Sequence, residues 1–267
     1  MIARGVFLDG RMGNHMFQYA FALADAKKRG GLFFVDQIKY NFLLPHHFQI
    51  RSYSSKQNSL LSKVYQWMPS LFKQANELSY SQAQGPLVYY KGFYQDEKYF
   101  AHCIKLIRNE LALKPEYAAA FNARYGDVYR QNKTIAVHIR RTDLLTLHID
   151  LGRPVNATLS DEYYQKCFNL IPNLQDYKIL FATDDTAYVK QKYGHMPNVL
   201  IEERDAITDY QVLLNADIVI SASSSYSWMA AYLNAKEGKR VFTPANWGII
   251  PRIAPPASEI NMWQVVN

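Results

Sequence analysis

Short apolar runs alternate with amphipathic segments along much of this chain, starting at its N-terminus. Residues 6–9 form an apolar run, residues 10–14 contain two glycines typical of a turn, and residues 15–29 carry apolar side chains at helical spacing. A Gly-Gly pair ends this predicted helix, and the apolar residues 32–35 predict a second strand. Strand, turn, helix and strand in this order are typical of the beginning of a parallel α/β sheet.

The pattern is less regular between residues 40 and 90. Residues 52–63 are polar and rich in serine, which favours a loop, whereas residues 60–72 predict a helix that Pro69 interrupts. The other elements predicted in this half are a strand and two helices, at residues 87–92, 102–113 and 116–125.

The second half alternates regularly between strands and helices. The predicted strands cover residues 134–139, 177–182, 199–201, 217–221 and 240–243. The predicted helices cover residues 161–170, 186–193, 207–215 and 228–234. Alternation of this kind predicts a doubly wound parallel sheet. We therefore expect an α/β protein with two Rossmann-type parallel-sheet halves and a cleft between them, divided into domains 1–132 and 133–267.

Composition narrows the classes of partner. The formal net charge of +7 and a pI of about 9.2 suit anionic partners such as nucleotide phosphates, nucleic acid or an anionic membrane face. The sequence has no run of five lysines and arginines, so it does not indicate a nucleic-acid-binding stripe. Cys103 and Cys167 lie far apart, which excludes a CxxC metal or redox motif and favours two buried thiols.

The N-terminal residues read as a strand and lack the layout of a signal peptide. No stretch approaches the roughly 18 consecutive apolar residues that span a membrane. We therefore expect a cytoplasmic protein without a membrane-spanning segment.

The segment from His138 to Asp143 is the strongest candidate for a functional site. It follows a buried apolar strand, and ligands of open α/β sheets bind at the carboxyl ends of strands. One of the adjacent Arg140 and Arg141 can grip a phosphate with two hydrogen bonds, while the other pairs with a carboxylate and stiffens the loop. Asp143, three residues after Arg140, is a natural partner. The alternative interpretation is a surface cluster of salt bridges.

A serine-rich turn follows the strand predicted at 217–221 and precedes a helix. Ser224 and Ser225 lie at the start of that helix, where exposed backbone N–H groups and hydroxyls can bind an anion. Simple capping of the helix by serine is the alternative. Because this turn and the arginine pair follow strands of the same predicted sheet, we expect both to contact one diphosphate.

Two further strand ends carry polar residues. Asp184 and Asp185 could bind a metal, accept hydrogen bonds from a base or a ribose, or cap the next helix; we expect no metal, because arginines and a helix end already serve the phosphates. Arg11, Gly13 and Asn14 form a turn that matches neither the dinucleotide fingerprint nor the P-loop. Arg11 and Asn14 would face the cleft, and a plain strand–helix turn is the alternative.

Other catalytic classes find no support in the residue pattern. The seven histidines are scattered, no HExxH motif occurs, and no Ser-His-Asp spacing suggests a triad. The residue pattern therefore does not favour a metal hydrolase.

Five ordered blocks together resemble the family-11 glycosyltransferases, the α-1,2-fucosyltransferases. They lie at residues 10–20, 92–100, 137–143, 181–185 and 223–233 and extend over nearly the whole chain. The block at 137–143 is similar to the family's HxRRxD motif. His15 stands where Gln is usual, Ser223 replaces Asn, and Met229 replaces Trp.

The resemblance implies a GT-B-like fold with an N-terminal acceptor-side domain and a C-terminal domain that binds the nucleotide sugar. It also implies inversion at the transferred sugar without a metal or other cofactor. The donor implied is GDP-fucose. Its β-phosphate would contact Arg140, its guanosine would lie near His138 and Asp184 or Asp185, and its diphosphate would contact Ser224 and Ser225. The residues that would approach the donor from the first domain are Arg11, Gly13 and Asn14.

The general base is the least defined part of this resemblance. Asp143 is a candidate unless an arginine occupies it, and His148 and Asp150 in the following loop are the others. The family's usual Gly-Asp-Tyr continuation is replaced here by Thr-Asp-Leu, which also leaves the acceptor pocket undefined.

The resemblance thus predicts transfer of L-fucose from GDP-β-L-fucose to a galactoside-type hydroxyl, forming an α-1,2 linkage in bacterial surface polysaccharide. The expected acceptor is a glycan or a lipid-linked oligosaccharide, met through peripheral contact with the inner membrane. We expect no nucleic-acid partner. The alternatives are another nucleotide sugar or linkage on the same scaffold, and a non-catalytic nucleotide- or glycan-binding protein.

Overall fold

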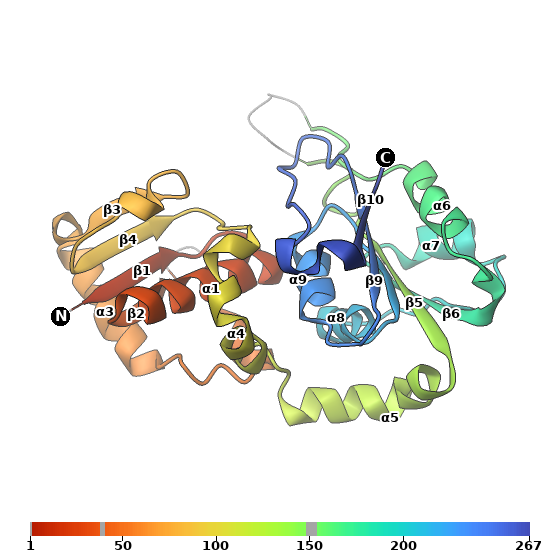
Figure 1. Ribbon diagram of the computed structural model, residues 1–267, viewed down its shortest axis with the longest axis horizontal. Helices are drawn as coiled ribbons and strands as arrows, with labels where there is room; N and C mark the ends of the chain where they lie inside the picture. Colours follow the sequence, from red (N-terminus) through yellow and green to blue (C-terminus); the bar gives the residue numbers. More distant parts are fainter. Residues whose placement is uncertain (1, 38–40, 148–153) are drawn as a thin grey trace. The chain divides into compact units, whose positions relative to one another are not determined.

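The chain folds into two compact units, Met1–Lys114 and Pro115–Asn267. The computed structural model describes residues 2–37, 41–147 and 154–267. Each unit contains one parallel sheet (Figure 1). No helix in these described ranges is long and apolar enough to cross a membrane.

The first unit is built on a four-stranded sheet. Its spatial order is β2-β1-β4-β3, and every neighbouring pair is parallel. The strands are β1 (Ala3–Phe7), β2 (Leu32–Asp36), β3 (Lys73–Asn76) and β4 (Leu87–Lys91). The helices are α1 (Met12–Arg29), α2 (Leu44–His47), α3 (Ser55–Trp67) and α4 (Ile104–Glu110), with 3₁₀ turns at Pro69–Leu71, Tyr80–Gln82, Glu97–Tyr99 and Ala101–Cys103.

Helices α1 and α3 cover opposite faces of this sheet. Successive side chains of a strand point to opposite faces. The Tyr90 hydroxyl accordingly donates to Asp25 of α1 at 2.8 Å, while the Tyr89 ring stacks on Tyr65 of α3 at 3.8 Å between centroids. Aromatic side chains therefore fill both layers of the unit.

The prediction of a loop at residues 52–63 is wrong, because α3 begins within it. Ser54 is the N-cap, and its hydroxyl accepts from the Gln57 N–H at 3.4 Å. The buried Asn58 side chain accepts from the N–H of Val35 at 2.7 Å and donates to its carbonyl at 3.1 Å. The polar residues that favoured a loop thus cap the helix and join it to β2.

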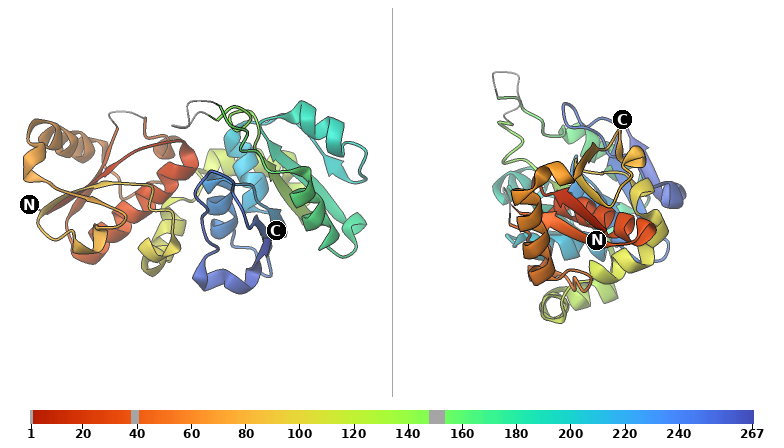
Figure 2. Two further views of the ribbon diagram at one scale, coloured as in Figure 1. Left: turned by 90° about the horizontal axis from the view of Figure 1, so that it is seen from above. Right: turned by 90° about the vertical axis from the view of Figure 1, so that its left-hand side faces the viewer.

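The second unit is built on a six-stranded sheet with the spatial order β10-β9-β8-β5-β6-β7, again with parallel neighbours. Helices lie on both faces of it (Figure 2). The strands are β5 (Lys133–Ile139), β6 (Tyr177–Thr183), β7 (Val199–Leu200), β8 (Ile218–Ile220), β9 (Arg240–Pro244) and β10 (Trp263–Val266). The helices are α5 (Pro115–Gln131), α6 (Asp161–Asn169), α7 (Thr186–Tyr193), α8 (Ala206–Leu214) and α9 (Ser225–Leu233), with 3₁₀ turns at Leu174–Asp176 and Ala257–Met262.

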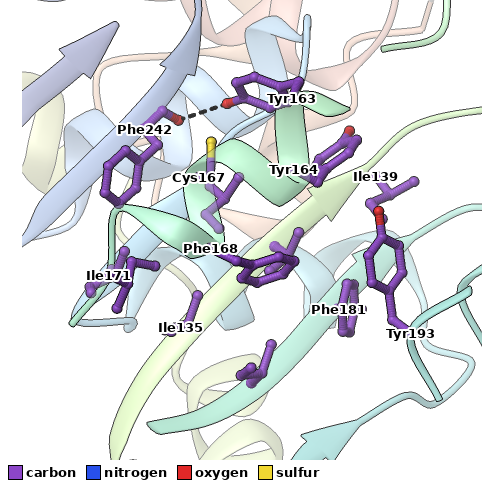
Figure 3. Close-up of a cluster of buried hydrophobic side chains, with 14 of the residues drawn as sticks. Ile135, Ile139, Tyr163, Tyr164, Cys167, Phe168, Ile171, Phe181, Tyr193 and Phe242 are labelled. Carbon is purple, nitrogen blue, oxygen red and sulfur yellow. Dashed lines mark hydrogen bonds between the residues drawn. The ribbon is translucent and has the colours of Figure 1, made fainter. Parts of the chain in front are cut away.

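One face of the second sheet packs under α6 and α7. Alternate residues of β5, including Ile135 and Ile139, enter this core together with Phe168 of α6 (Figure 3). The Tyr163 hydroxyl donates to the carbonyl oxygens of Ser221 at 2.8 Å and Phe242 at 3.2 Å, which ties α6 to the ends of β8 and β9. The next residues along β5 and β9 therefore point to the other face, toward α8 and α9.

The observed division of the chain differs from the predicted boundary at 132/133. Helix α5 belongs to the second unit rather than the first. Its Tyr125 hydroxyl donates to Glu202 at 2.6 Å, and its Tyr129 hydroxyl donates to the Val212 carbonyl of α8 at 2.8 Å. These contacts join residues about 80 positions apart, which no local pattern reveals.

Candidate functional site

Arg140 follows β5 directly and is engaged by Asp143 at two points. Its Nε donates to Oδ1 at 3.0 Å, and its Nη2 donates to Oδ2 at 2.5 Å. This confirms the predicted pairing of these two residues. Among the described residues, Nη1 and the second hydrogen of Nη2 have no acceptor, and the side chain is only half-buried.

Asp184 holds the loop that carries the arginines. Its carboxylate accepts from the backbone N–H of Arg141 at 2.8 Å, and from the backbone N–H and hydroxyl of Thr142 at 3.2 and 2.6 Å. The two residues meet because β5 and β6 are parallel neighbours whose last paired residues are Ile139 and Thr183. Asp184 thus supports the loop after β5 from the loop after β6.

Arg141 lies against the start of α7. Its Nε donates to Asp185 at 3.2 Å, and its guanidinium lies 3.6 Å from the centroid of the Tyr188 ring. Asp185 also caps the helix, since it accepts from the Tyr188 N–H at 3.0 Å. Arg141 therefore has a structural environment, as expected for the arginine that stiffens the loop.

His138 is a buried imidazole on the α9 side of β5. Burial, together with the nearby Arg140 charge, lowers its pKa from 6.5 to about 3, so the ring is neutral at physiological pH. Its Nδ1 has no hydrogen-bond partner among the described residues. The ring lies 5.4 Å from that of Tyr226 in α9.

The N-terminus of α9 lies beside His138, because β8 and β5 are neighbours. Ser224 is the N-cap, and its hydroxyl accepts from the Tyr226 N–H at 3.3 Å. Ser225 is the first helical residue. Next to the cap, the Ser223 hydroxyl is buried without a partner in the described part of the chain, and so is the Thr243 hydroxyl at the end of β9.

Asp209 is a buried carboxylate that the sequence reasoning missed. Its Oδ2 accepts from the Thr183 N–H at the end of β6 at 3.1 Å, and Arg204 approaches its Oδ1 to 3.5 Å without a hydrogen bond. Burial raises the pKa of this carboxyl from 3.8 to about 7, although the Arg204 charge opposes the rise. An acidic residue among the apolar positions of the predicted helix 207–215 is the signal that could have found it.

The polar turn of the first unit is held by contacts between two sequence blocks. Arg11 is exposed at the N-cap of α1, and Gly13 is buried within the first turn. Asn14 accepts from the Gln95 side chain at 2.8 Å, and Gln18 donates to the Gly92 carbonyl at 3.0 Å. The blocks at 10–20 and 92–100 thus form one local arrangement.

The described structure covers most predicted site residues. It brings His138, Arg140 and Asp143 to one edge of the second sheet with Asp184, Asp185, Ser224 and Ser225. Arg11, Gly13 and Asn14 lie at the end of β1 in the first unit. His148 and Asp150 fall outside the described residues.

Solved structures with a similar fold include fucosyltransferases. The fucosyltransferase NodZ from Bradyrhizobium superposes with a TM-score of 0.55 at 14% identity, covering 87% of this chain and 94% of that one. POFUT1 in complex with GDP superposes with a TM-score of 0.55 at 14% identity, covering 90% and 97%. The two parallel-sheet units therefore have the GT-B fold.

The sequence comparisons narrow this class. The profile of Glycosyl transferase family 11 matches residues 3–259, so the chain belongs to that family and is a glycosyltransferase. An alpha-1,2-colitosyltransferase of Escherichia coli is 24% identical over 90% of both chains. The O-antigen biosynthesis glycosyltransferase WbnK of Escherichia coli is 27% identical over 46% of this chain and 42% of its own length.

Proposed function

We propose that this enzyme transfers L-fucose from GDP-β-L-fucose to a galactoside-type hydroxyl, inverting the anomeric centre and forming an α-1,2 linkage. The observation that carries the proposal is a row of polar groups at the carboxyl ends of β5, β8 and β9. These are the Arg140 guanidinium, the N-terminus of α9, and the buried polar atoms of His138, Ser223 and Thr243 that have no partner among the described residues.

Strand register places these groups side by side. Val137 pairs with Ile220, and Ile220 pairs with Phe242, so the carboxyl ends of the three strands lie within two residues of one another. A buried hydroxyl or imidazole nitrogen without a partner costs free energy, which a bound ligand can recover by supplying the hydrogen bond. A diphosphate fits this edge, because its oxygens accept from guanidinium, hydroxyl and helix N–H groups alike.

The geometry supports a mechanism based on leaving-group stabilisation. When GDP departs, negative charge develops on its β-phosphate, and Arg140 and the α9 N-terminus stabilise that charge as it forms. Asp143 holds the guanidinium in place through Nε and Nη2, so Nη1 faces the phosphate without reorganisation. The acceptor hydroxyl attacks from the opposite face of the sugar, which inverts the anomeric carbon.

The base of the donor would be recognised by the buried groups next to this edge. Asp209 offers an oxygen acceptor, and His138 offers a neutral ring nitrogen. Guanine presents adjacent N–H donors and a carbonyl acceptor, so this pair suits guanine better than a base that presents a single donor. Asp184 and Asp185, which we had expected near the guanosine, would act on it indirectly through the loop that they hold.

Catalysis without a metal is part of the proposal. Both carboxylates of the Asp184-Asp185 pair are already occupied by loop N–H groups, by Arg141 and by the start of α7. The positive charge that a metal would supply to the diphosphate comes instead from Arg140 and the helix N-terminus.

The names of the two relatives bear on the donor sugar and on the acceptor. One relative is named for colitose transfer, so the same scaffold with another nucleotide sugar is the runner-up. The other relative is named for O-antigen biosynthesis, which supports a glycan of bacterial surface polysaccharide, carried on a lipid, as acceptor.

A donor and acceptor screen tests this function. The purified chain is incubated with GDP-fucose and other nucleotide sugars, together with galactoside acceptors, while GDP release and product mass are measured. We expect GDP-fucose to give the highest turnover and a product heavier by one fucosyl residue. Tight GDP binding without turnover on any pair would instead favour a non-catalytic nucleotide-binding protein.

A further inference from the structure

Helix α3 carries an apolar and basic stripe on the side that faces away from its own sheet. The α3 stripe consists of Lys56, Leu60, Lys63 and Trp67, spaced four, three and four residues apart. At 100° per residue these four side chains fall within a narrow arc of the helix. All four are exposed, Leu60 by 63% and Trp67 by 78%.

The opposite side of α3 already accounts for the stability of the helix. Leu61 and Tyr65 pack there against the core of the first unit, with Phe34 and Tyr89 of the sheet. An exposed Trp and Leu on the outer side therefore add nothing to the folding of the unit. Large exposed apolar side chains that gather in this way mark interaction surfaces more often than chance positions do.

Exposed apolar residues also follow α3. Met68 and Leu71 follow directly and are exposed by 46% and 54%. The whole segment from residue 37 to residue 76 contains no aspartate or glutamate, whereas it contains five lysines and arginines. The five basic residues are Lys39, Arg51, Lys56, Lys63 and Lys73.

We propose that the α3 stripe binds an anionic lipid bilayer. Trp and Leu side chains insert at the level of the headgroups, while flanking lysines extend their ammonium groups to lipid phosphates. The segment itself contributes no acidic residue to offset its lysines and arginines, which suits the negative surface of a bacterial membrane. The helix would lie in the plane of the interface, as amphipathic surface helices do.

Charge distinguishes this partner from a second copy of the chain. A symmetric dimer through the α3 stripe would bring the same surface of each copy together. Lys56 and Lys63 of one copy would then face lysines of the other, and like charges at an interface oppose association. A lipid surface presents the opposite sign over its whole area.

Membrane binding by the α3 stripe goes beyond the proposed transfer reaction, and only its biological role rests on that reaction. A lipid-linked acceptor lies at the membrane, so an enzyme held there meets it in two dimensions rather than three. Lipid binding and donor binding use different residues, and therefore each can fail without the other.

Co-sedimentation with liposomes tests the proposal on the full chain. Vesicles of equal parts phosphatidylglycerol and phosphatidylcholine are compared with vesicles of phosphatidylcholine alone. We expect the wild-type chain to bind the anionic vesicles and to lose binding as salt rises. The double variant Leu60→Ser with Trp67→Ser should bind about tenfold more weakly, since two inserted apolar side chains are lost.

Two further variants make the test specific. Lys56→Gln with Lys63→Gln should remove most of the preference for anionic vesicles. Leu78→Ser is the matched control, because Leu78 is 91% exposed beyond the other end of β3 and should leave binding unchanged. Circular dichroism and thermal unfolding show whether each variant is folded, and GDP binding, measured by calorimetry, should be equal in all of them.

Three results would overturn the proposal. The first is failure of the wild-type chain to bind anionic vesicles at low salt. The second is equal binding by the Leu60 and Trp67 double variant and the Leu78 control. The third is a dimer in sedimentation velocity that the double variant dissociates, because the stripe would then serve self-association. Failure of the wild-type chain to bind GDP would contradict the proposed function, but it would not contradict lipid binding by the α3 stripe.

Discussion

Arg140 and Asp143 form a two-point ion pair at the end of β5, with Nε to Oδ1 at 3.0 Å and Nη2 to Oδ2 at 2.5 Å. A guanidinium held in this way has one side occupied and the other side fixed in direction. In the proposed function, this pair would orient Arg140 toward the phosphate, and variants of the two residues should then have different effects.

Replacing Arg140 by Ala should reduce turnover by about a hundredfold or more, the effect of losing one electrostatic donor to a transition state. Thermal stability should change little, because the pair is half-exposed and such pairs contribute at most about 1 kcal/mol. Steady-state kinetics with GDP release as the readout measure this. The control is Arg130→Ala, which removes an exposed ion pair with Asp127 on α5. Near-normal turnover of the Arg140 variant would exclude Arg140 as the phosphate contact.

Asp143→Asn separates an orienting role from a role as general base. Because both carboxylate oxygens of Asp143 are engaged by Arg140, we expect orientation to dominate, with kcat lowered by about tenfold and the shape of the pH–rate profile retained. The measurement is kcat as a function of pH in both proteins. Loss of the acidic limb, together with a drop of about a thousandfold, would identify Asp143 as the base instead.

Asp184→Ala should weaken GDP binding, although Asp184 makes no direct contact with the nucleotide in the proposed function. The substitution leaves the N–H groups of Arg141 and Thr142 without their acceptor, so the loop that carries Arg140 loses its support. We expect a stability loss of about 1 kcal/mol and a several-fold higher Kd for GDP. Calorimetry and urea unfolding measure the two effects. Asp176→Ala, at an exposed aspartate in a 3₁₀ turn, should change neither quantity, and equal behaviour of both variants would contradict the supporting role.

The buried imidazole of His138 should make the protein less stable as the pH falls. Its pKa is 6.5 in the unfolded chain and about 3 in the folded protein, so the unfolded state binds one more proton between these values. The free energy of unfolding should therefore fall by about 1.4 kcal/mol per pH unit below pH 6.5 from this residue. Burial also lowers the pKa of His15, which adds a contribution of the same sign.

Urea unfolding of wild type and His138→Gln across this pH range measures the contribution. The variant should show a smaller loss of stability on acidification, while His195→Gln, at an exposed histidine, should follow wild type. Identical pH dependence in wild type and the His138 variant would mean that folding does not lower the pKa of His138.

Activity should persist in EDTA at the level measured without it. The carboxylates of Asp184 and Asp185 are bound to the protein, and the proposed phosphate contacts come from Arg140 and α9. The assay is GDP release in chelator-treated enzyme with and without added Mg²⁺ or Mn²⁺. Strong inhibition by EDTA that a divalent metal reverses would instead support metal binding by Asp184 and Asp185.

Local pattern predicted most of the elements, because their residues repeat at the period of the structure they form. Helix α7 spans the predicted residues 186–193, and α1 includes the whole predicted segment 15–29. The parts that were missed depend on distant partners. The helix predicted from residue 60 overlaps α3, but the beginning of α3 looks polar until Asn58 meets β2, and the polar strand β3 exists only because β4 pairs with it.

The sequence by itself determined which chemistry is present: an imidazole, two arginines and an aspartate after one strand, serines after another, and two aspartates after a third. Only the tertiary structure decided which group meets which. Because β5 pairs with β6 in this register, Asp184 accepts from the loop backbone and Asp185 accepts from the Arg141 side chain. Arg140 pairs with Asp143 instead. The fold also buries Asp209 at the same edge, where its carboxylate accepts a hydrogen bond from the backbone N–H of Thr183, 26 residues earlier in the chain. Residue types follow from the chain, whereas pairing, burial and the resulting pKa values depend on contacts between segments far apart in it.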